Sequence, residues 1–246
     1  MNKSMMKKYF SIIFLILILL ASVLSSDRSV RVMKNIFDTD KEEEKETQYI
    51  IVVDPGHGGR DPGKVGVNNA LEKEINLSIA FKLKSLLEQN DIKVIMTREE
   101  DVGLYSETDS NKKNADLNKR IEIIQTSKAN LAVSIHQNSF VEEYVKGAQV
   151  FFHAQSNKGK RLAEIMQAQL IETIADGNHR KAKSNNNYYM LKKTECPFVI
   201  VECGYMSNRS EAALLLEEEY QEKMAWGIHL AILQFINEGG LKSDTE

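Results

Sequence analysis

A short apolar strand that runs directly into a glycine-rich turn constrains this chain more than any other feature. Residues 50–53 form the run Ile-Ile-Val-Val, and residues 55–59 end it with one proline and three glycines. Such a run is typical of a buried strand, and the turn places His57 at its apex. Ligands collect at the carboxyl ends of strands in α/β proteins, so His57 is a candidate functional residue. A tight turn that merely contains a histidine would have the same sequence.

Strand and helix patterns alternate through the rest of the chain. Apolar runs predict strands at 49–54, 91–98, 131–135, 147–152, 188–191 and 198–201, and helical spacing of apolar residues predicts helices at 72–90, 114–127, 159–175, 209–216 and 220–236. This order favours an α/β fold, a single three-layer domain whose mixed, mostly parallel sheet of about six strands is flanked by helices.

The amino-terminal residues have a different composition. Lys3, Lys7 and Lys8 precede an apolar stretch at 10–24, which is long for a signal peptide and short for a spanning helix. Residues 1–26 are therefore a signal peptide or an N-terminal membrane anchor, and both imply an exported, extracytoplasmic protein, secreted or anchored by this segment. Residues 27–48 are charged and predict a solvated linker. The folded domain is then expected at 49–240.

The charge balance argues against nucleic acid as a partner. The 246 residues carry a formal charge of −3. Residues 1–26 contain three lysines and no acids, so the exported remainder carries −6. An acidic domain lacks the positive surface that a phosphate backbone requires.

The two cysteines predict free thiols. Cys196 and Cys203 are seven residues apart on what resembles one strand. At about 3.3 Å per residue they would be roughly 23 Å apart, well beyond the limit of about 7 Å for a disulfide. Neither a disulfide nor a C-x-x-C metal site is expected.

Four side chains together suggest a metal site. His57, His136 and Glu202 follow predicted strands, and Glu72 begins a predicted helix. Two imidazoles and one carboxylate with an open position suit catalytic zinc, and a second carboxylate can serve as general base. Spacing alone does not establish that they converge. Glu72 could simply complement the helix dipole, whereas a carboxylate after an apolar strand, as at Glu202, is costly unless paired or functional.

The segments around these residues resemble a known family. Residues 54–59 (DPGHGG), 72–73 (EK), 134–138 (SIHQN) and 202–208 (ECGYMSN) are similar, in order, to the motifs of zinc-dependent N-acetylmuramoyl-L-alanine amidases of the amidase_3 type. The resemblance covers about residues 49–237. It implies one Zn²⁺ per chain held by His57, Glu72 and His136, with Glu202 as the catalytic carboxylate and peptidoglycan as the substrate.

Other positions match the family or depart from it. Thr97-Arg98, Asp116-Leu117 and Arg120 match, and we assign them structural roles. Gln137 stands where the family usually has a small residue, and Tyr205 where it usually has phenylalanine. Some regulated relatives insert a long segment after the second histidine, but residues 139–146 are too few for such a plug.

The layout also suggests a narrower likeness. The stretch 180–183 (RKAK) and the compact single domain look most like the germination-related amidase of spore-forming bacteria, which prepares cortex peptidoglycan for muramic lactam formation. The sequence has no wall-binding repeat. Targeting is therefore expected to depend on the N-terminal segment, which engages the membrane or the export machinery, or on an accessory protein partner.

The resemblance implies hydrolysis of the amide bond between N-acetylmuramic acid and L-alanine. Glu202 would take a proton from water and return it to the departing amine. Asn138 and the backbone amides of the glycine turn are candidate substrate contacts. Two alternatives remain open: a zinc peptidase or carboxypeptidase that acts on the stem peptide, and an inactive peptidoglycan-binding scaffold, which the presence of Glu202 disfavours.

Overall fold

The computed structural model describes residues 12–18 and 49–242. Residues 12–18 are helical, and the remainder of the predicted signal or anchor and all of the predicted linker lie outside the described residues. Within the described parts of the chain, no helix has the length and apolar character needed to cross a membrane. The folded unit that contains residues 49–242 is described below by itself.

One sheet of six strands organises this unit, in the order β2-β1-β3-β6-β4-β5. All neighbouring strands are parallel except β4 and β6, which are antiparallel. The predicted mixed, mostly parallel sheet is therefore confirmed. The strands are β1 (Ile50–Pro55), β2 (Lys93–Met96), β3 (Leu131–Asn138), β4 (Gln149–Phe152), β5 (Lys183–Ser184) and β6 (Phe198–Tyr205).

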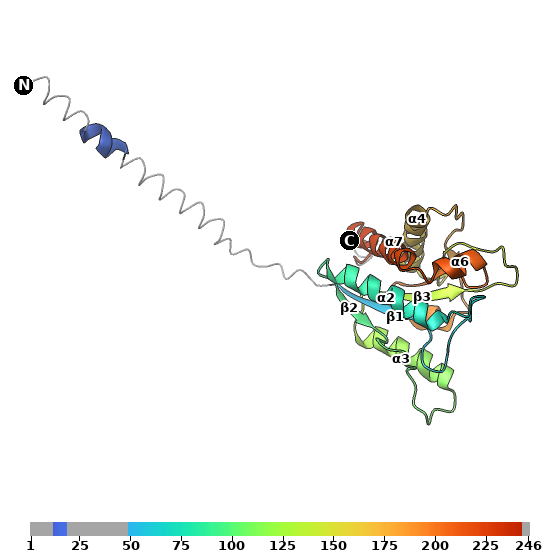
Figure 1. Ribbon diagram of the computed structural model, residues 1–246. Helices are drawn as coiled ribbons and strands as arrows, with labels where there is room; N and C mark the ends of the chain where they lie inside the picture. Colours follow the sequence, from blue (N-terminus) through green and yellow to red (C-terminus); the bar gives the residue numbers. More distant parts are fainter. Residues whose placement is uncertain (1–11, 19–48, 243–246) are drawn as a thin grey trace, which may run out of the picture. The chain divides into compact units, whose positions relative to one another are not determined.

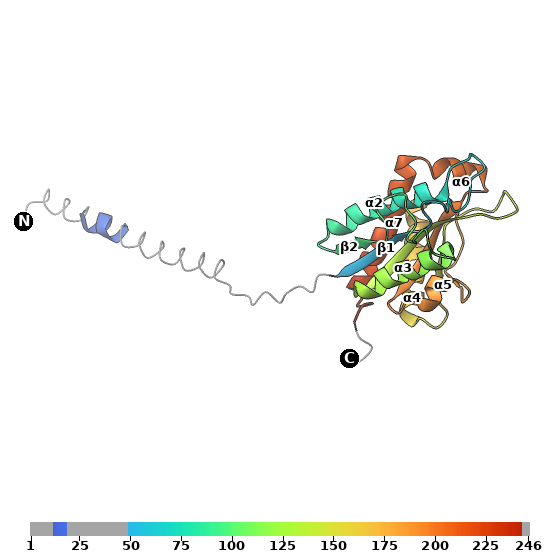
Figure 2. The same cartoon turned by 90° about the horizontal axis from the view of Figure 1, so that it is seen from below.

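Helices cover both faces of the sheet and give the three layers (Figures 1 and 2). They are α2 (Glu72–Glu88), α3 (Lys112–Thr126), α4 (Asn157–Ile174), α5 (Tyr189–Lys193), α6 (Arg209–Leu214) and α7 (Glu218–Asn237). Helices α2, α4 and α7 pack with Ile51 and Val53 in the larger core, whereas α3 and α5 pack with Val52 in a smaller one. Successive strand residues point to opposite faces, so each face receives its own apolar set.

The central strands continue past their predicted apolar ends. Strand β3 includes His136 and Asn138, and β6 includes Glu202 and Tyr205. The ladder persists because these polar residues pair with each other: His136 lies beside Glu202, and Asn138 beside Tyr205. Two candidate site residues are thus fixed as neighbours by backbone hydrogen bonds.

The strand predicted at 188–191 is wrong. This segment contains the short helix α5, and the edge strand is β5, which pairs with Phe151 and Phe152 of β4. The amides of Asn187 and Tyr188 both donate to the Asn185 side chain, which turns the chain before α5. Adjacent Met190 and Leu191 are both buried, as one turn of helix permits and an alternating strand does not.

The cysteines are free thiols, as predicted. Cys203 is fully buried within β6. Cys196, however, precedes β6 instead of lying in it. The sequence therefore placed one of the two on the wrong element, but the conclusion about the disulfide is correct.

Candidate functional site

His57, Glu72 and His136 come together at the carboxyl ends of β1 and β3. Their ligand atoms all lie within 4.8 Å of one another. Glu72 Oε1 lies 3.2 Å from His57 Nε2 and 3.0 Å from His136 Nδ1. Residues 15 to 79 positions apart in sequence thus meet because β1 and β3 are adjacent parallel strands and α2 begins beside their ends.

Glu72 is held in place by backbone donors. Its Oε1 accepts the Gln137 amide at 3.0 Å and its Oε2 accepts the Lys64 amide at 2.7 Å. Burial alone would raise the pKa of Glu72, but the hydrogen bonds with His136 and His57 overcome it and lower the pKa below its usual range. The carboxylate is therefore ionised and oriented toward both imidazoles.

His57 is oriented by Asp61, which the sequence analysis did not identify. His57 Nδ1 lies 2.8 Å from Asp61 Oδ2, which leaves Nε2 directed toward Glu72. Burial lowers the pKa of His57, but the hydrogen bonds with Asp61 and Glu72 outweigh it and raise the pKa to about 9. The only sequence signal was a carboxylate four residues after His57 within the glycine turn. A carboxylate behind a histidine ligand fixes its tautomer and its ring orientation.

The turn itself is unusual backbone. His57 has φ +62°, a left-handed conformation that a non-glycine residue seldom adopts. At Gly56, an added Cβ would overlap the His136 ring, and at Gly63 (φ +69°) it would meet the Glu72 carboxylate. Glycine at these two positions lets the backbone approach both candidate ligands closely.

Two arginines donate hydrogen bonds to the backbone carbonyls of the glycine turn. Arg120 donates to the carbonyl oxygens of Pro55 at 2.8 Å and His57 at 2.6 Å. Arg98 donates to those of Pro55 and Gly56, each at 3.0 Å. These contacts fit the structural roles predicted for both arginines, because they satisfy carbonyls that the left-handed turn leaves unpaired.

Asp54 completes this network. Its side chain is fully buried and accepts hydrogen bonds from Arg120 at 2.7 Å, Thr97 at 2.6 Å and Ser134 at 2.5 Å. Arg120 also donates to Asp116 at 2.6 Å. Burial alone would raise the pKa of Asp54, but the Arg120 charge and these hydrogen bonds lower it.

Glu202 differs from every other carboxylate at the site. It is 7% exposed and lies in the same cleft as the three-residue cluster. Its Oε2 is buried without a hydrogen-bond partner among the described residues. Burial raises the pKa of Glu202 to about 7, although the nearby positive potential of His136 opposes this shift. A proton acceptor with a free oxygen and a pKa near neutrality is suited to general acid–base chemistry.

The two kinds of candidate substrate contact, the Asn138 side chain and the amides of the glycine turn, differ in their surroundings. Asn138 lines the cleft, which has a volume of about 580 Å³. The amides of Gly56, Gly58 and Gly59, in contrast, donate to Ile135, Asp61 and Asp101 within the chain. The glycine turn therefore has fewer free donors than the sequence suggested.

The cluster fits a zinc ion in its donor chemistry. Two imidazole nitrogens and one carboxylate oxygen are the His₂Glu set of catalytic zinc sites, which keep a further position open. The Asp61 contact supplies the outer carboxylate that such histidines require.

The chain is similar to known amidases. The N-acetylmuramoyl-L-alanine amidase family model Amidase_3 matches residues 51–234. The germination-specific N-acetylmuramoyl-L-alanine amidase of Bacillus subtilis is 37% identical over 194 residues, or 78% of this chain and 81% of that protein. The CwlD amidase of Clostridioides difficile, solved in complex with the GerS lipoprotein, is 39% identical with a TM-score of 0.75, over 78% of this chain and 100% of that one. AmiC2 of Nostoc punctiforme is 31% identical with a TM-score of 0.68, over 77% and 97%.

Proposed function

The chain belongs to the Amidase_3 family of N-acetylmuramoyl-L-alanine amidases, and we propose that it is a zinc-dependent member in which His57, Glu72 and His136 hold one Zn²⁺ and Glu202 is the catalytic base. The observation that carries the assignment is the difference between Glu72 and Glu202 in their hydrogen-bond partners. The two oxygens of Glu72 already have three hydrogen bonds and an ion pair with His57, whereas Glu202 has an oxygen with no partner among the described residues. An oriented anion suits a ligand, and an unpaired one suits a base.

The proposed reaction is hydrolysis of the amide between the lactyl group of N-acetylmuramic acid and L-alanine. Bound Zn²⁺ supplies Lewis acidity toward a carbonyl and lowers the pKa of water. The Glu202 carboxylate accepts the proton of the attacking water as the water oxygen adds to the carbonyl carbon. Glu202 then transfers that proton to the nitrogen as the carbon–nitrogen bond breaks, so L-alanine leaves as a neutral amine. We assign Asn138, on the cleft wall, to substrate contact.

We further propose a role in spore cortex maturation, in which this cleavage precedes muramic lactam formation. The supporting observations are the germination-specific name of the Bacillus subtilis relative and the similarity to CwlD over the whole of that chain. Because the CwlD structure is a complex with a lipoprotein, an accessory protein partner for this chain is part of the proposal.

The place of action in the proposal is outside the cytoplasm. Lysines followed by an apolar stretch within residues 1–26 support export or membrane anchoring, and the charged residues 27–48 would give the catalytic domain reach from the membrane. Proteolytic mapping of the mature amino terminus in the native host distinguishes a cleaved signal from a retained anchor.

The test is to digest purified peptidoglycan with the zinc-loaded full chain and identify the products by mass spectrometry. The proposal predicts intact stem peptides that begin with L-alanine, together with glycan strands that retain the lactyl carboxyl group. Shortened stems still attached to glycan would instead indicate a peptidase. Binding to peptidoglycan without any cleavage by the zinc-loaded chain would indicate a scaffold.

A further inference from the structure

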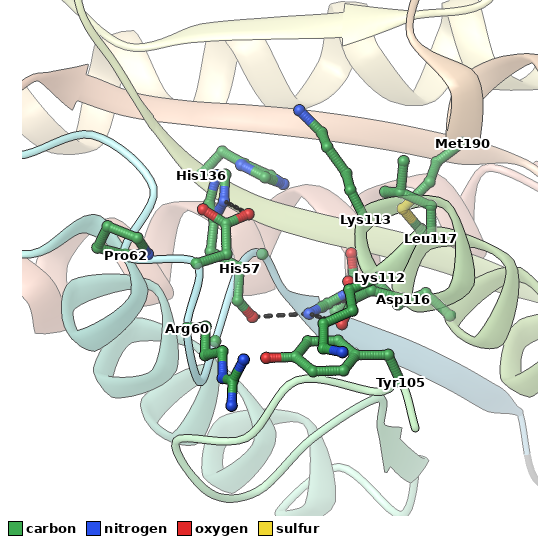
Figure 3. A pocket seen from close by; sticks show the side chains of 15 residues that line it. His57, Arg60, Pro62, Tyr105, Lys112, Lys113, Asp116, Leu117, His136 and Met190 are labelled. Carbon is green, nitrogen blue, oxygen red and sulfur yellow. Dashed lines mark hydrogen bonds and ion pairs between the residues drawn. The ribbon is translucent and has the colours of Figure 1, made fainter. Parts of the chain in front are cut away.

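A second hollow opens from the candidate histidine ligands toward the beginning of α3 (Figure 3). Its volume is about 370 Å³, and His57 and His136 are among the residues that line it. Leu117 and Met190 line one side of it. Because this hollow is continuous with the two imidazoles, a molecule whose reacting bond lies at the cluster can extend into it.

Four cationic side chains line this hollow, and three of them have anionic partners. Arg120 is buried against Asp54 at 2.7 Å and Asp116 at 2.6 Å. Arg60 lies 3.2 Å from Glu107, and Lys112 lies 3.5 Å from the same carboxylate. Lys112 also donates to the Glu107 carbonyl at 2.7 Å and lies over the Tyr105 ring. Lys112 therefore joins the loop that contains Glu107 to the beginning of α3, and Arg60 joins the same loop to the glycine turn.

The fourth cation, Lys113, is different. Within residues 49–242 it takes part in no hydrogen bond and no ion pair. The pKa of the nearby Asp61 carboxyl is lowered chiefly by its hydrogen bond with His57, and the Lys113 charge adds a smaller contribution in the same direction. Asp61 is already occupied by His57 and by the Gly63 amide. Figure 3 shows the Lys113 side chain extending away from Lys112 and Tyr105, toward the side on which the His136 ring lies.

The position of Lys113 indicates which kind of ligand its charge can bind. Lys113 lines the hollow and also the wider cleft that contains Glu202. The exported part of the chain is acidic, with a formal charge of −6 that follows from its composition. A positive group that faces a cleft on an acidic domain attracts anionic ligands locally.

We propose that the Lys113 side of this hollow is the subsite for the stem peptide, and that the Lys113 ammonium group binds a carboxylate of that peptide. This inference rests on the proposed amidase function. The glycan has no free carboxyl at the reacting muramic acid, because its lactyl group is consumed in the amide bond. The stem, in contrast, continues from L-alanine to an acidic residue, which lies within about 7 Å of the reacting bond in an extended chain.

The same geometry gives the substrate a direction across the cleft. The peptide leaves the cluster toward α3, between the apolar wall of Leu117 and Met190 and the cation of Lys113. The glycan must then leave by another part of the cleft. A chain whose second stem residue is amidated lacks the charge that Lys113 recognises, so Lys113 determines specificity for stems with a free carboxylate.

The experiment compares two soluble muropeptides, one with a free carboxylate on the second stem residue and one with a carboxamide there. Binding is measured by calorimetry on the zinc-loaded full chain that carries Glu202→Gln, so that no turnover occurs. Lys113→Ala is added to this chain, with Lys113→Arg as the conservative variant. Lys119→Ala is the matched control, because Lys119 is exposed on the same helix and pairs with Glu122 away from the hollow.

We expect Lys113→Ala to weaken binding of the carboxylate muropeptide by about tenfold, since a charge-assisted contact is lost. Binding of the carboxamide form should be unchanged, Lys113→Arg should restore most of the affinity, and Lys119→Ala should match the parent. Equal weakening of both muropeptides, or no weakening of either, would overturn the subsite. The proposed function fails separately, when the chain with Glu202 intact releases no stem peptide while the binding preference persists.

Discussion

Asp54 and Glu202 are two buried carboxylates on strands of one sheet that are separated by β3, and their surroundings are opposite. Asp54 lies near the carboxyl end of β1, next to the glycine turn, and accepts hydrogen bonds from Arg120, Thr97 and Ser134. Glu202 lies on β6 beside the cleft, with one oxygen that has no partner among the described residues. The first has a lowered pKa, and the second has a pKa raised to about 7.

This difference separates a structural charge from a reactive one. When all the oxygens of a buried carboxylate accept hydrogen bonds, these bonds stabilise its ionised form and hold the donor residues in place. A buried carboxylate with an unpaired oxygen costs folding free energy, and beside a cleft such a group suits a functional role. Burial alone does not distinguish the two, because both side chains are less than 10% exposed. Their hydrogen-bond partners do.

The largest expected effect is on catalysis. Glu202→Gln keeps the shape of the side chain and removes the proton acceptor, so the amidase rate should fall by about 10²–10⁴-fold. The melting temperature should stay the same or rise, because an unpaired buried acid is replaced by a neutral amide. Stem-peptide release and thermal unfolding, measured on the same preparation, check both parts. If the loss of unfolding free energy were as large as the loss of transition-state stabilisation, Glu202 would be a structural residue.

The reverse pattern is expected at Asp54. Asp54→Asn removes one partner of a buried ion pair and leaves Arg120 partly uncompensated, so the free energy of unfolding should decrease by about 3–5 kcal/mol. Urea unfolding measures this change. Asp116→Asn is the matched control, since Asp116 pairs with the same arginine but is more exposed, and its cost should be smaller. Equal costs would mean that burial does not set the strength of the pair.

Asp61 tests how far positioning extends beyond the cluster. Asp61→Asn weakens the contact that orients His57, so the affinity for zinc should fall by about 10–100-fold. Competition with a chromophoric chelator gives the affinity. The control is Asp101→Asn, which alters the far side of the same turn through Gly59 and Lys73. An equal loss in both variants would assign the effect to the turn as a whole.

The smallest effect is the pH dependence of the Asp54 contribution. Because the folded-state pKa of Asp54 is lowered, its stabilisation is fully present above the unfolded value of about 4 and is lost as the pH falls through the folded pKa. The stability difference between the wild type and Asp54→Asn should therefore be constant from pH 5 upward, to within about 0.5 kcal/mol, and shrink below about pH 4. A difference that grows with acidity would contradict the assigned direction.

The sequence was most informative where the apolar patterns of strands and helices follow one another. The periodicity of β1, α2 and β3 located the elements that present His57, Glu72 and His136, and the fold class is confirmed. It failed at 188–191, because a short apolar run can form a strand or a helical turn, and the Asn185 side chain decides between them. Strand ends were also set too early, since pairing between His136 and Glu202 is not visible in hydrophobicity.

The site was predictable by residue type but not by contact. Histidines and carboxylates after apolar strands marked the candidates, whereas their convergence depends on strand order, which one sequence does not fix. Asp61 and Lys113 had no pattern that set them apart from solvated charges. Their significance comes from what they contact: Asp61 has His57 as its partner, and Lys113 faces the hollow with no ion-pair partner among residues 49–242.

The zinc content of two matched variants is the most direct test of the roles proposed for Glu72 and Glu202. Glu72→Gln and Glu202→Gln are purified under identical conditions, and metal is measured by plasma mass spectrometry after exhaustive dialysis. If Glu72 is a ligand and Glu202 the base, Glu202→Gln retains about one zinc per chain without amidase activity, and Glu72→Gln retains much less. Loss of zinc from Glu202→Gln together with normal zinc in Glu72→Gln would exchange the two roles and contradict the account.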